Sequence, residues 1–388
     1  MPIVYPYKQY QGVWTLSQAS DAVAQGKWPN YPAPHLYAWG ANFVFQNSGA
    51  LGLNVPSTNY SSPKQVGSLT NWLYLAGGYG CSVAVKTDGT LWTWGNNGSG
   101  QSGLGNVTIY SSPKQVGSLT NWSKVAMDGF VLAIKTDGTL WSWGDNSSGQ
   151  LGFNNTTLYS SPKQVGSLNN WANISCGSSH GIAVKTDGTL WTWGSNAQGQ
   201  LGLNNTTSYS SPKQVGALTN WANVFCGDVS SVAIKTDGTI WSWGQNTYGQ
   251  LGTGNTTAYS SPKQIGALSN WSTASKFFRF GVAAIKTDGS LWTWGDNHLG
   301  ALGQGNTTNL SSPKQVGSLT NWSKVFAGNQ FVLSIKTDGT LWSWGANDRG
   351  ELGTGNITYY SSPKQVGALT TWLAVGAGSY HAFGIATT

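Results

Sequence analysis

The residues able to do chemistry are few, and their spacing does not assemble a catalytic or metal site. The 388 residues include four histidines and three cysteines. Cys176 and Cys226 occupy the same place in two copies of a repeat, so a metal would have to bridge two copies. Six aspartates belong to a recurring K-T-D-G turn, and no phosphate-binding or dinucleotide fingerprint is present. We therefore expect no catalytic residue, no metal and no cofactor.

A repeat of about 50 residues organises the chain and must position whatever the protein binds with. Its clearest mark is a Trp-Gly pair, which ends at Gly40, Gly95, Gly144, Gly194, Gly244, Gly295 and Gly345. A Ser-Ser-Pro-Lys-Gln segment and a single Trp recur with the same period, seven times each. A period of this length is typical of solenoids and propellers.

Each copy predicts four short strands. In the third copy these are residues 172–176, 181–185, 190–193 and 212–215, with an Asp-Gly hairpin turn between the second and third. Pro212 starts the fourth strand, where proline is tolerated only at an edge. Four antiparallel strands in each repeat are typical of a propeller blade.

The two ends of the chain complement each other. K-T-D-G occurs six times, and the seventh copy stops at Thr388, where this turn would begin. The missing strand is found at residues 36–40. We predict an all-β fold, a seven-bladed β-propeller over residues 34–388. Strand 36–40 closes it by pairing with the C-terminal blade, which removes an open sheet edge.

One face of this propeller is expected to vary between copies. The turn after the first strand and the loop after the third strand differ in every copy, whereas the K-T-D-G turns are nearly identical. We interpret the variable face as a recognition surface, while drift of surface turns after duplication is the alternative. The candidate binding residues are Tyr79, Asp128, Phe130, His180, Asp228, Tyr248, Phe278, Arg279, Phe280, His298, Gln330, Phe331, Arg349, Tyr380 and His381.

Two repeated features have plainer interpretations. His180 and His381 fall in a slot that holds Cys81, Phe130 or Phe331 in other copies, which favours a structural role over catalysis. The paired tryptophans of each Trp-x-Trp-Gly strand are interpreted as core and inter-blade packing rather than as a carbohydrate platform.

The repeat pattern K-T-D-G-x-[LI]-W-x-W-G-x-N-x-x-G-Q-L-G resembles that of the regulator of chromosome condensation (RCC1-like) family. The resemblance covers residues 34–388 and implies a seven-bladed propeller. Family members include an exchange factor for a small GTPase, signalling scaffolds and a bacterial β-lactamase inhibitor. No long insertion suited to an exchange wedge is present, so the resemblance implies binding to a protein without assigning exchange activity.

Residues 1–33 lie outside the repeat and are predicted to form an arm with a short helix. Trp14, Leu16, Val23 and Trp28 are its candidate docking residues, either on another protein or on its own propeller. The segment G-V-W-T-L-S-Q with the following G-K-W-P resembles elements of structural and tail-fibre proteins of marine bacteriophages. This resemblance implies a virion component, whose arm anchors it and whose variable face meets a host surface or another protein.

Composition limits the setting and the partners. The net charge is +7, but most of the basic residues occupy the same positions in every repeat and do not form a patch on one face. This distribution disfavours a nucleic-acid partner. We expect no signal peptide and no membrane insertion. The expected function is a non-enzymatic virion protein made in the host cytoplasm. The alternatives are a soluble inhibitor or scaffold in the bacterial cytoplasm, and a lyase or hydrolase with its site in the central channel.

Overall fold

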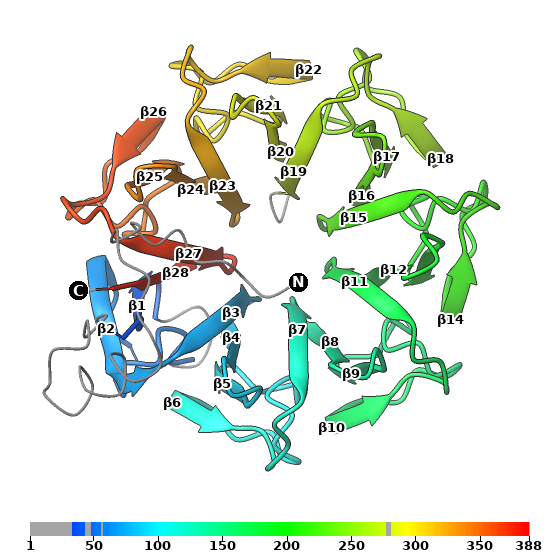
Figure 1. Cartoon of the computed structure of the whole chain (residues 1–388), viewed down its shortest axis with the longest axis horizontal. Coiled ribbons are helices and arrows are strands. Elements are labelled where there is room, and N and C mark those ends of the chain that lie inside the picture. The colour runs from blue at the N-terminus through cyan, green and yellow to red at the C-terminus, as the bar shows by residue number, and fades with distance from the viewer. Residues whose placement is uncertain (1–32, 43–47, 56, 277–280, 388) are drawn as a thin grey trace, which may run out of the picture. The chain divides into compact units, whose positions relative to one another are not determined.

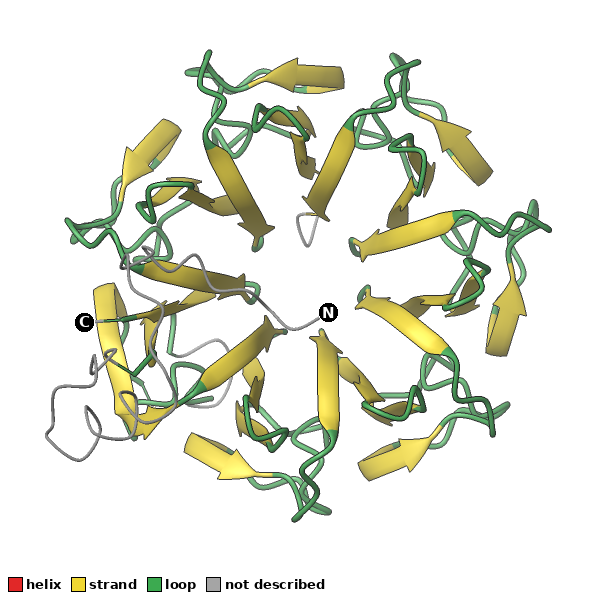
Figure 2. Cartoon of the chain, viewed as in Figure 1, coloured by secondary structure: helices red, strands yellow, loops and turns green. Residues whose placement is uncertain are grey.

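The computed structural model describes residues 33–42, 48–55, 57–276 and 281–387. In these residues every regular element is a β-strand (Figure 2). None of the described segments forms a helix long and apolar enough to cross a membrane. The short helix expected near the N-terminus falls outside the described residues.

The strands form seven antiparallel four-stranded sheets, the blades, arranged around a ring (Figure 1). The inner strands are β3 (Trp72–Gly77), β7 (Trp122–Met127), β11 (Trp171–Cys176), β15 (Trp221–Cys226), β19 (Trp271–Lys276), β23 (Trp322–Ala327) and β27 (Trp372–Ala377). The second strands are β4 (Cys81–Lys86), β8 (Phe130–Lys135), β12 (His180–Lys185), β16 (Ser230–Lys235), β20 (Gly281–Lys286), β24 (Phe331–Lys336) and β28 (His381–Ala386).

The remaining strands complete each blade towards the periphery. The third strands are β5 (Leu91–Gly95), β9 (Leu140–Gly144), β13 (Leu190–Gly194), β17 (Ile240–Gly244), β21 (Leu291–Gly295), β25 (Leu341–Gly345) and β1 (His35–Gly40). The outer strands are β6 (Tyr110–Gln115), β10 (Tyr159–Gln164), β14 (Tyr209–Gln214), β18 (Tyr259–Gln264), β22 (Leu310–Gln315), β26 (Tyr360–Gln365) and β2 (Tyr60–Thr70). Each outer strand begins before its proline, which lies on the sheet edge where its missing N–H is tolerated.

The ring is closed by the two ends of the propeller, as predicted. Strand β1 pairs with β28 in antiparallel register, with Ala38 opposite Phe383, and with β2 on its other side. The indole Nε1 of Trp39 donates to the carbonyl oxygen of Glu351 at 2.8 Å. Strands from opposite ends of the sequence therefore form one blade, so the closing blade has no open seam.

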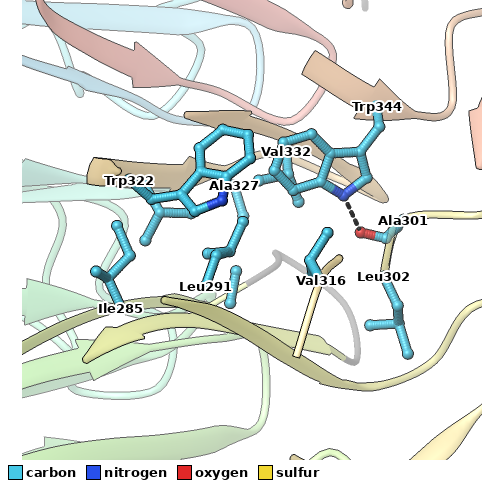
Figure 3. Packing of buried hydrophobic residues seen from close by; sticks show 11 residues of the cluster. Ile285, Leu291, Ala301, Leu302, Val316, Trp322, Ala327, Val332 and Trp344 are labelled. Carbon is cyan, nitrogen blue, oxygen red and sulfur yellow. Dashed lines mark hydrogen bonds between the residues drawn. The ribbon is translucent and has the colours of Figure 1, made fainter. Parts of the chain in front are cut away.

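Tryptophan packing holds neighbouring blades together (Figure 3). Between two of them, Ile285 and Leu291 of one blade pack against Trp322 and Trp344 of the next. The indole Nε1 of Trp344 donates to Ala301 O at 2.9 Å, and equivalent bonds recur around the ring. The second tryptophan of each pair is almost fully buried, which confirms its interpretation as inter-blade packing.

The Trp-Gly glycines are required by close approach as well as by conformation. Gly144 has φ of 105°, and a Cβ placed there would lie 2.9 Å from Phe130 Cα. Any other residue would therefore be strained and would collide with the paired strand. This constraint explains why the pair recurs in every blade.

The K-T-D-G turns are closed by their own side chains. In the third blade, Asp187 Oδ1 accepts hydrogen bonds from the Thr189 backbone N–H at 2.9 Å and from its hydroxyl at 2.6 Å. Lys185 is buried, with its amine 4.9 Å from the Trp171 ring centre and 3.8 Å from that of Trp191. The Asp-Gly hairpin predicted from sequence is confirmed, and its lysine is part of the packing.

Candidate binding face

Strand direction divides the turns between two faces of the ring. The variable face comprises the turns from inner to second strands and the loops that follow the third strands. The constant face comprises the K-T-D-G turns and the turns that lead into the inner strands. Because all blades share one topology, side chains from every blade gather on each face.

Five residues assigned to the variable face are buried: Asp128, described below, and four for which the expectation of direct contact is wrong. Phe130, His180, Phe331 and His381 each begin a second strand, and none has exposed surface. Their side chains fill the space between blades, so they have nothing to offer a partner. Spacing in the sequence placed them next to a surface turn but did not give their direction.

The two buried histidines serve as inter-blade hydrogen-bonding groups. His180 Nε2 lies 3.0 Å from Ser231 Oγ, and His381 Nε2 lies 3.2 Å from Ser82 Oγ. Burial lowers the pKa of His381 to about 3, because an apolar environment disfavours the charged ring. The ring is therefore neutral at physiological pH, in keeping with the predicted structural role.

Three candidates form a partly exposed stack that spans the last two blades and the first. The Arg349 guanidinium carbon lies 4.8 Å from the Tyr380 ring centre. Tyr380 in turn meets Tyr79 edge to face, with ring centres 6.1 Å apart, and Tyr79 is 40% exposed. The stack joins side chains from two turns and one loop of the variable face, and ring closure brings Tyr79 to Tyr380.

A second polar cluster lies on the sixth blade and its neighbour. His298 Nδ1 lies 2.7 Å from Asp296 Oδ2, and its Nε2 lies 3.0 Å from Gln330 Nε2. This pattern suits the tautomer that donates to Asp296 and accepts from the Gln330 amide. Asp296 is buried, while the His298 side chain is 56% exposed. The carboxylate therefore orients an imidazole that a partner can reach, and sequence analysis did not single out Asp296.

The central channel is lined by the ends of the inner strands that lead into the variable face. Residues of all seven inner strands line a cavity of about 190 Å³, and Asp128 lies in its wall. Burial, with a smaller contribution from the charge of Asp228, raises the pKa of Asp128 to about 8. Asp228 itself accepts a hydrogen bond from Ser178 Oγ at 2.9 Å. Asp128 is therefore largely protonated at neutral pH, and Asp228 is the partly exposed member of this pair.

Two cysteines near the channel are held as thiols. Burial raises the pKa of Cys81 to about 12 and raises that of Cys176 well above its usual value. Such thiols are poor nucleophiles and poor metal ligands, because both roles need the thiolate. In the described ranges, no group of three or more His, Cys, Asp or Glu side chains is arranged to hold a metal.

The other candidates divide into one exposed residue and several without a described position. Tyr248 is 38% exposed at the tip of its loop. The segment with Phe278, Arg279 and Phe280 lies outside the described residues. The arm residues Trp14, Leu16, Val23 and Trp28 also lie outside them, so the arm remains a prediction.

Seven four-stranded blades, each with a Trp-Gly pair at the end of its third strand, define a class of β-propeller. The RCC1-like domain family matches residues 35–384, and this chain belongs to that family. The resemblance of the repeats to this family is thus confirmed. No curated protein sequence matches the chain.

Solved structures share the fold at low sequence identity. Human WBSCR16 has a TM-score of 0.82 at 22% identity, covering 92% of this chain and 99% of its own. Prp20p from Saccharomyces cerevisiae has a TM-score of 0.80 at 18% identity, covering 92% and 93%. Yeast RCC1 (Prp20) bound to Kap60 has a TM-score of 0.79 at 17% identity, covering 100% and 96%. At these identities the comparison establishes the architecture and not the ligand.

Proposed function

We propose that this propeller is a non-enzymatic protein-binding module that contacts its partner with the variable face. The observation that carries the proposal is the partly exposed stack of Arg349, Tyr380 and Tyr79. Arginine and tyrosine are enriched among the residues that dominate protein interfaces, because they combine apolar area with directional polar groups. Here a rigid ring holds them, so little conformational entropy is lost on binding.

The structural relatives support a protein partner. One Prp20p structure is described together with its binding to Gsp1p and histones, and another has Kap60 bound. Those partners belong to Prp20p. For this chain the relatives support only the class of ligand, and the variable face differs enough between blades to specify a ligand of its own.

The setting we propose is a bacteriophage virion. Residues 1–33 would anchor the protein to another virion protein, and the variable face would bind a host-surface protein. The resemblance of the arm to phage tail-fibre elements supports this setting. The competing function is a soluble inhibitor or scaffold in the bacterial cytoplasm, which would use the same face without an anchored arm.

Binding of the whole chain to host-cell envelopes and to virions tests both the use of the variable face and the virion setting. The variant Tyr79→Ser, Arg349→Ala, Tyr380→Ser should bind envelopes at least about tenfold more weakly, the loss expected when a hot spot is removed. The matched control is Tyr259→Ser with Lys263→Ala, which removes a cation–π pair (5.3 Å) from an outer strand. Equal loss in the two variants would contradict a role for the variable face.

A double variant of the N-terminal arm separates the virion setting from the soluble one. Trp14→Ala with Trp28→Ala should abolish virion binding while leaving envelope binding unchanged. If the unaltered protein binds neither virions nor envelopes, the phage setting is wrong. The variable face would then be tested against bacterial cytoplasmic proteins.

A further inference from the structure

The constant face carries an apolar feature that recurs in every blade. Seven leucines, one from each blade, are between 37% and 51% exposed. They are Leu69, Leu119, Leu168, Leu218, Leu268, Leu319 and Leu369, and we call them the leucine ring. All occupy the same slot, just before the Trp that starts an inner strand. Each leaves apolar surface in contact with water, which burial against a partner would remove.

The leucine ring differs from the other exposed apolar residues of the protein. Val107, Leu158 and Ile357 are also exposed, but their slots hold other residues in most copies. The residue before each ring leucine is Ser or Ala, and the next is Thr or Asn or Ser. The leucine itself never changes, although its neighbours do.

Hydrogen bonds fix five of the seven ring leucines between two K-T-D-G turns, and Leu69 and Leu369 beside one, because the last blade has no such turn. The turn carrying Leu218 is held on one side by the Trp221 N–H, which donates to Gly188 O at 3.1 Å. On the other side the Thr236 N–H donates to Asn220 O at 2.9 Å. Leu218 is thus presented on a turn that hydrogen bonds hold between the K-T-D-G turns of Asp187 and Asp237.

The K-T-D-G turns beside the leucine ring expose negative charge, although the whole chain is basic. Asp187 and Asp237 are exposed, and hydrogen bonds from the following threonines hold the pKa of each carboxyl below its usual value. The lysines of the same turns, Lys185 and Lys235, are buried against tryptophan rings. Lysines of the outer strands lean over tyrosines at the edge of the ring, as Lys263 does over Tyr259.

We propose that the constant face is a second docking surface, for a protein surface that presents apolar side chains flanked by lysine or arginine. Charge complementarity selects this occupant over a second copy of the chain, because two constant faces would bring aspartates opposite aspartates. Seven equivalent positions suit a partner that repeats the same contact, so that weak single contacts add through avidity. This surface is opposite to the variable face and does not depend on the function proposed for it.

A pair of synthetic peptides tests the proposal on the full chain. One alternates leucine with lysine and the other alternates leucine with glutamate, each displayed densely on a sensor surface. We expect the basic peptide to bind and the acidic peptide not to bind, even though the protein carries a net charge of +7. Added salt should weaken binding, because the aspartates are exposed. Preference for the acidic peptide, or no binding of the basic one, would overturn the proposal.

Variants locate the binding on the leucine ring. Leu218→Ser, Leu268→Ser and Leu319→Ser together should weaken binding of the basic peptide at least about tenfold through lost avidity. The matched control, Val107→Ser, Leu158→Ser and Ile357→Ser, removes aliphatic groups that are 43–64% exposed and should change it less than about twofold. Equal loss in both sets would overturn the proposal.

The charge and the competing occupant are tested separately. Asp187→Asn, Asp237→Asn and Asp288→Asn keep an oxygen that accepts the turn hydrogen bonds but remove three charges. These substitutions should weaken binding of the basic peptide about threefold to tenfold and abolish most of the salt dependence of that binding. Sedimentation checks for self-association. A dimer that the leucine variants dissolve would assign this face to a second copy and overturn the proposed partner.

Discussion

The constant face and the variable face are built from the same strands, yet their side chains are held differently. On the constant face, a lysine between two tryptophans and an aspartate closing its own turn recur in the same geometry from blade to blade. On the variable face, Arg349 stacks on Tyr380 in one place and His298 meets Asp296 in another. The repeated contacts of the constant face stabilise each blade in the same way. The contacts of the variable face differ from blade to blade, which is compatible with selection of a partner.

Removing a tryptophan of the constant face should have the largest effect. Trp171 is 4% exposed and packs edge to face against Trp191 and Trp193, with ring centres 6.1 and 6.3 Å away. Trp171→Ala should lower the free energy of unfolding by about 3–5 kcal/mol in denaturant titration, because it leaves a cavity. Tyr248→Ala on the variable face is the control, with an expected change of about 0.5 kcal/mol or less. Equal losses would break the comparison of the faces.

The buried histidine beneath the variable face should contribute to acid unfolding. The pKa of His381 is about 3 in the fold and close to its ordinary value when unfolded, so the unfolded state binds the proton first. Stability is therefore unaffected above pH 6.5 and is lost as the pH falls towards 3. Between pH 7 and pH 4 this amounts to about 3 kcal/mol.

His381→Phe places at this slot the residue that two other blades carry there, Phe130 and Phe331. The variant should unfold at lower pH than the unaltered protein when both are followed by tryptophan fluorescence. The same acid profile in both would show that burial of this ring does not govern acid unfolding.

The single glutamate in a slot filled by glutamine in four other loops should show the opposite pH dependence. Burial raises the pKa of Glu351 to about 7. A raised carboxyl pKa means that the fold favours the protonated form, so stability falls as the pH rises from 4.5 to 7. Glu351→Gln should stabilise the protein by about 3 kcal/mol above pH 7 and leave it unchanged at pH 4.

Gln150 shows why the amide fits this slot. Its Oε1 accepts from the Ser148 N–H at 2.8 Å, as Glu351 Oε2 does from the Arg349 N–H. Thermal unfolding at both pH values checks the prediction, with Gln150→Glu as the reverse change. A gain that is equal at pH 4 and pH 8 would rule out the titration as its cause.

Removing the partly exposed stack on the variable face should lower the free energy of unfolding by the smallest amount. The triple variant Tyr79→Ser, Arg349→Ala, Tyr380→Ser removes two aromatic contacts at the surface, and we expect a loss of about 1 kcal/mol or less. A loss of several kcal/mol in denaturant titration would mean that the stack holds the ring closed. The variable face would then share the structural role of the constant face.

The directions of individual side chains could not be predicted from the repeat. Phe130 and Phe331 lie beside variable turns in the sequence, and the same slot in other blades holds histidine, cysteine or serine. Such a mixture suits either an exposed or a buried position. The structure turns the slot inward between blades, where small and large side chains are matched to their neighbours. Periodicity fixes which residues are equivalent, but not which neighbours they meet.

The amino-acid sequence by itself determined the number of blades, the strands of each blade, the Asp-Gly turns and the closure by strand β1. These follow from local turn chemistry and from a period repeated seven times, which few other folds satisfy. Only the tertiary structure decided that Tyr79 and Tyr380 meet, that Asp128 is buried beside Asp228, and that the leucine ring is exposed. Those outcomes depend on contacts between residues far apart in the chain. Burial and the interaction between charges are set by the distance between residues in space, which their separation in the sequence does not give.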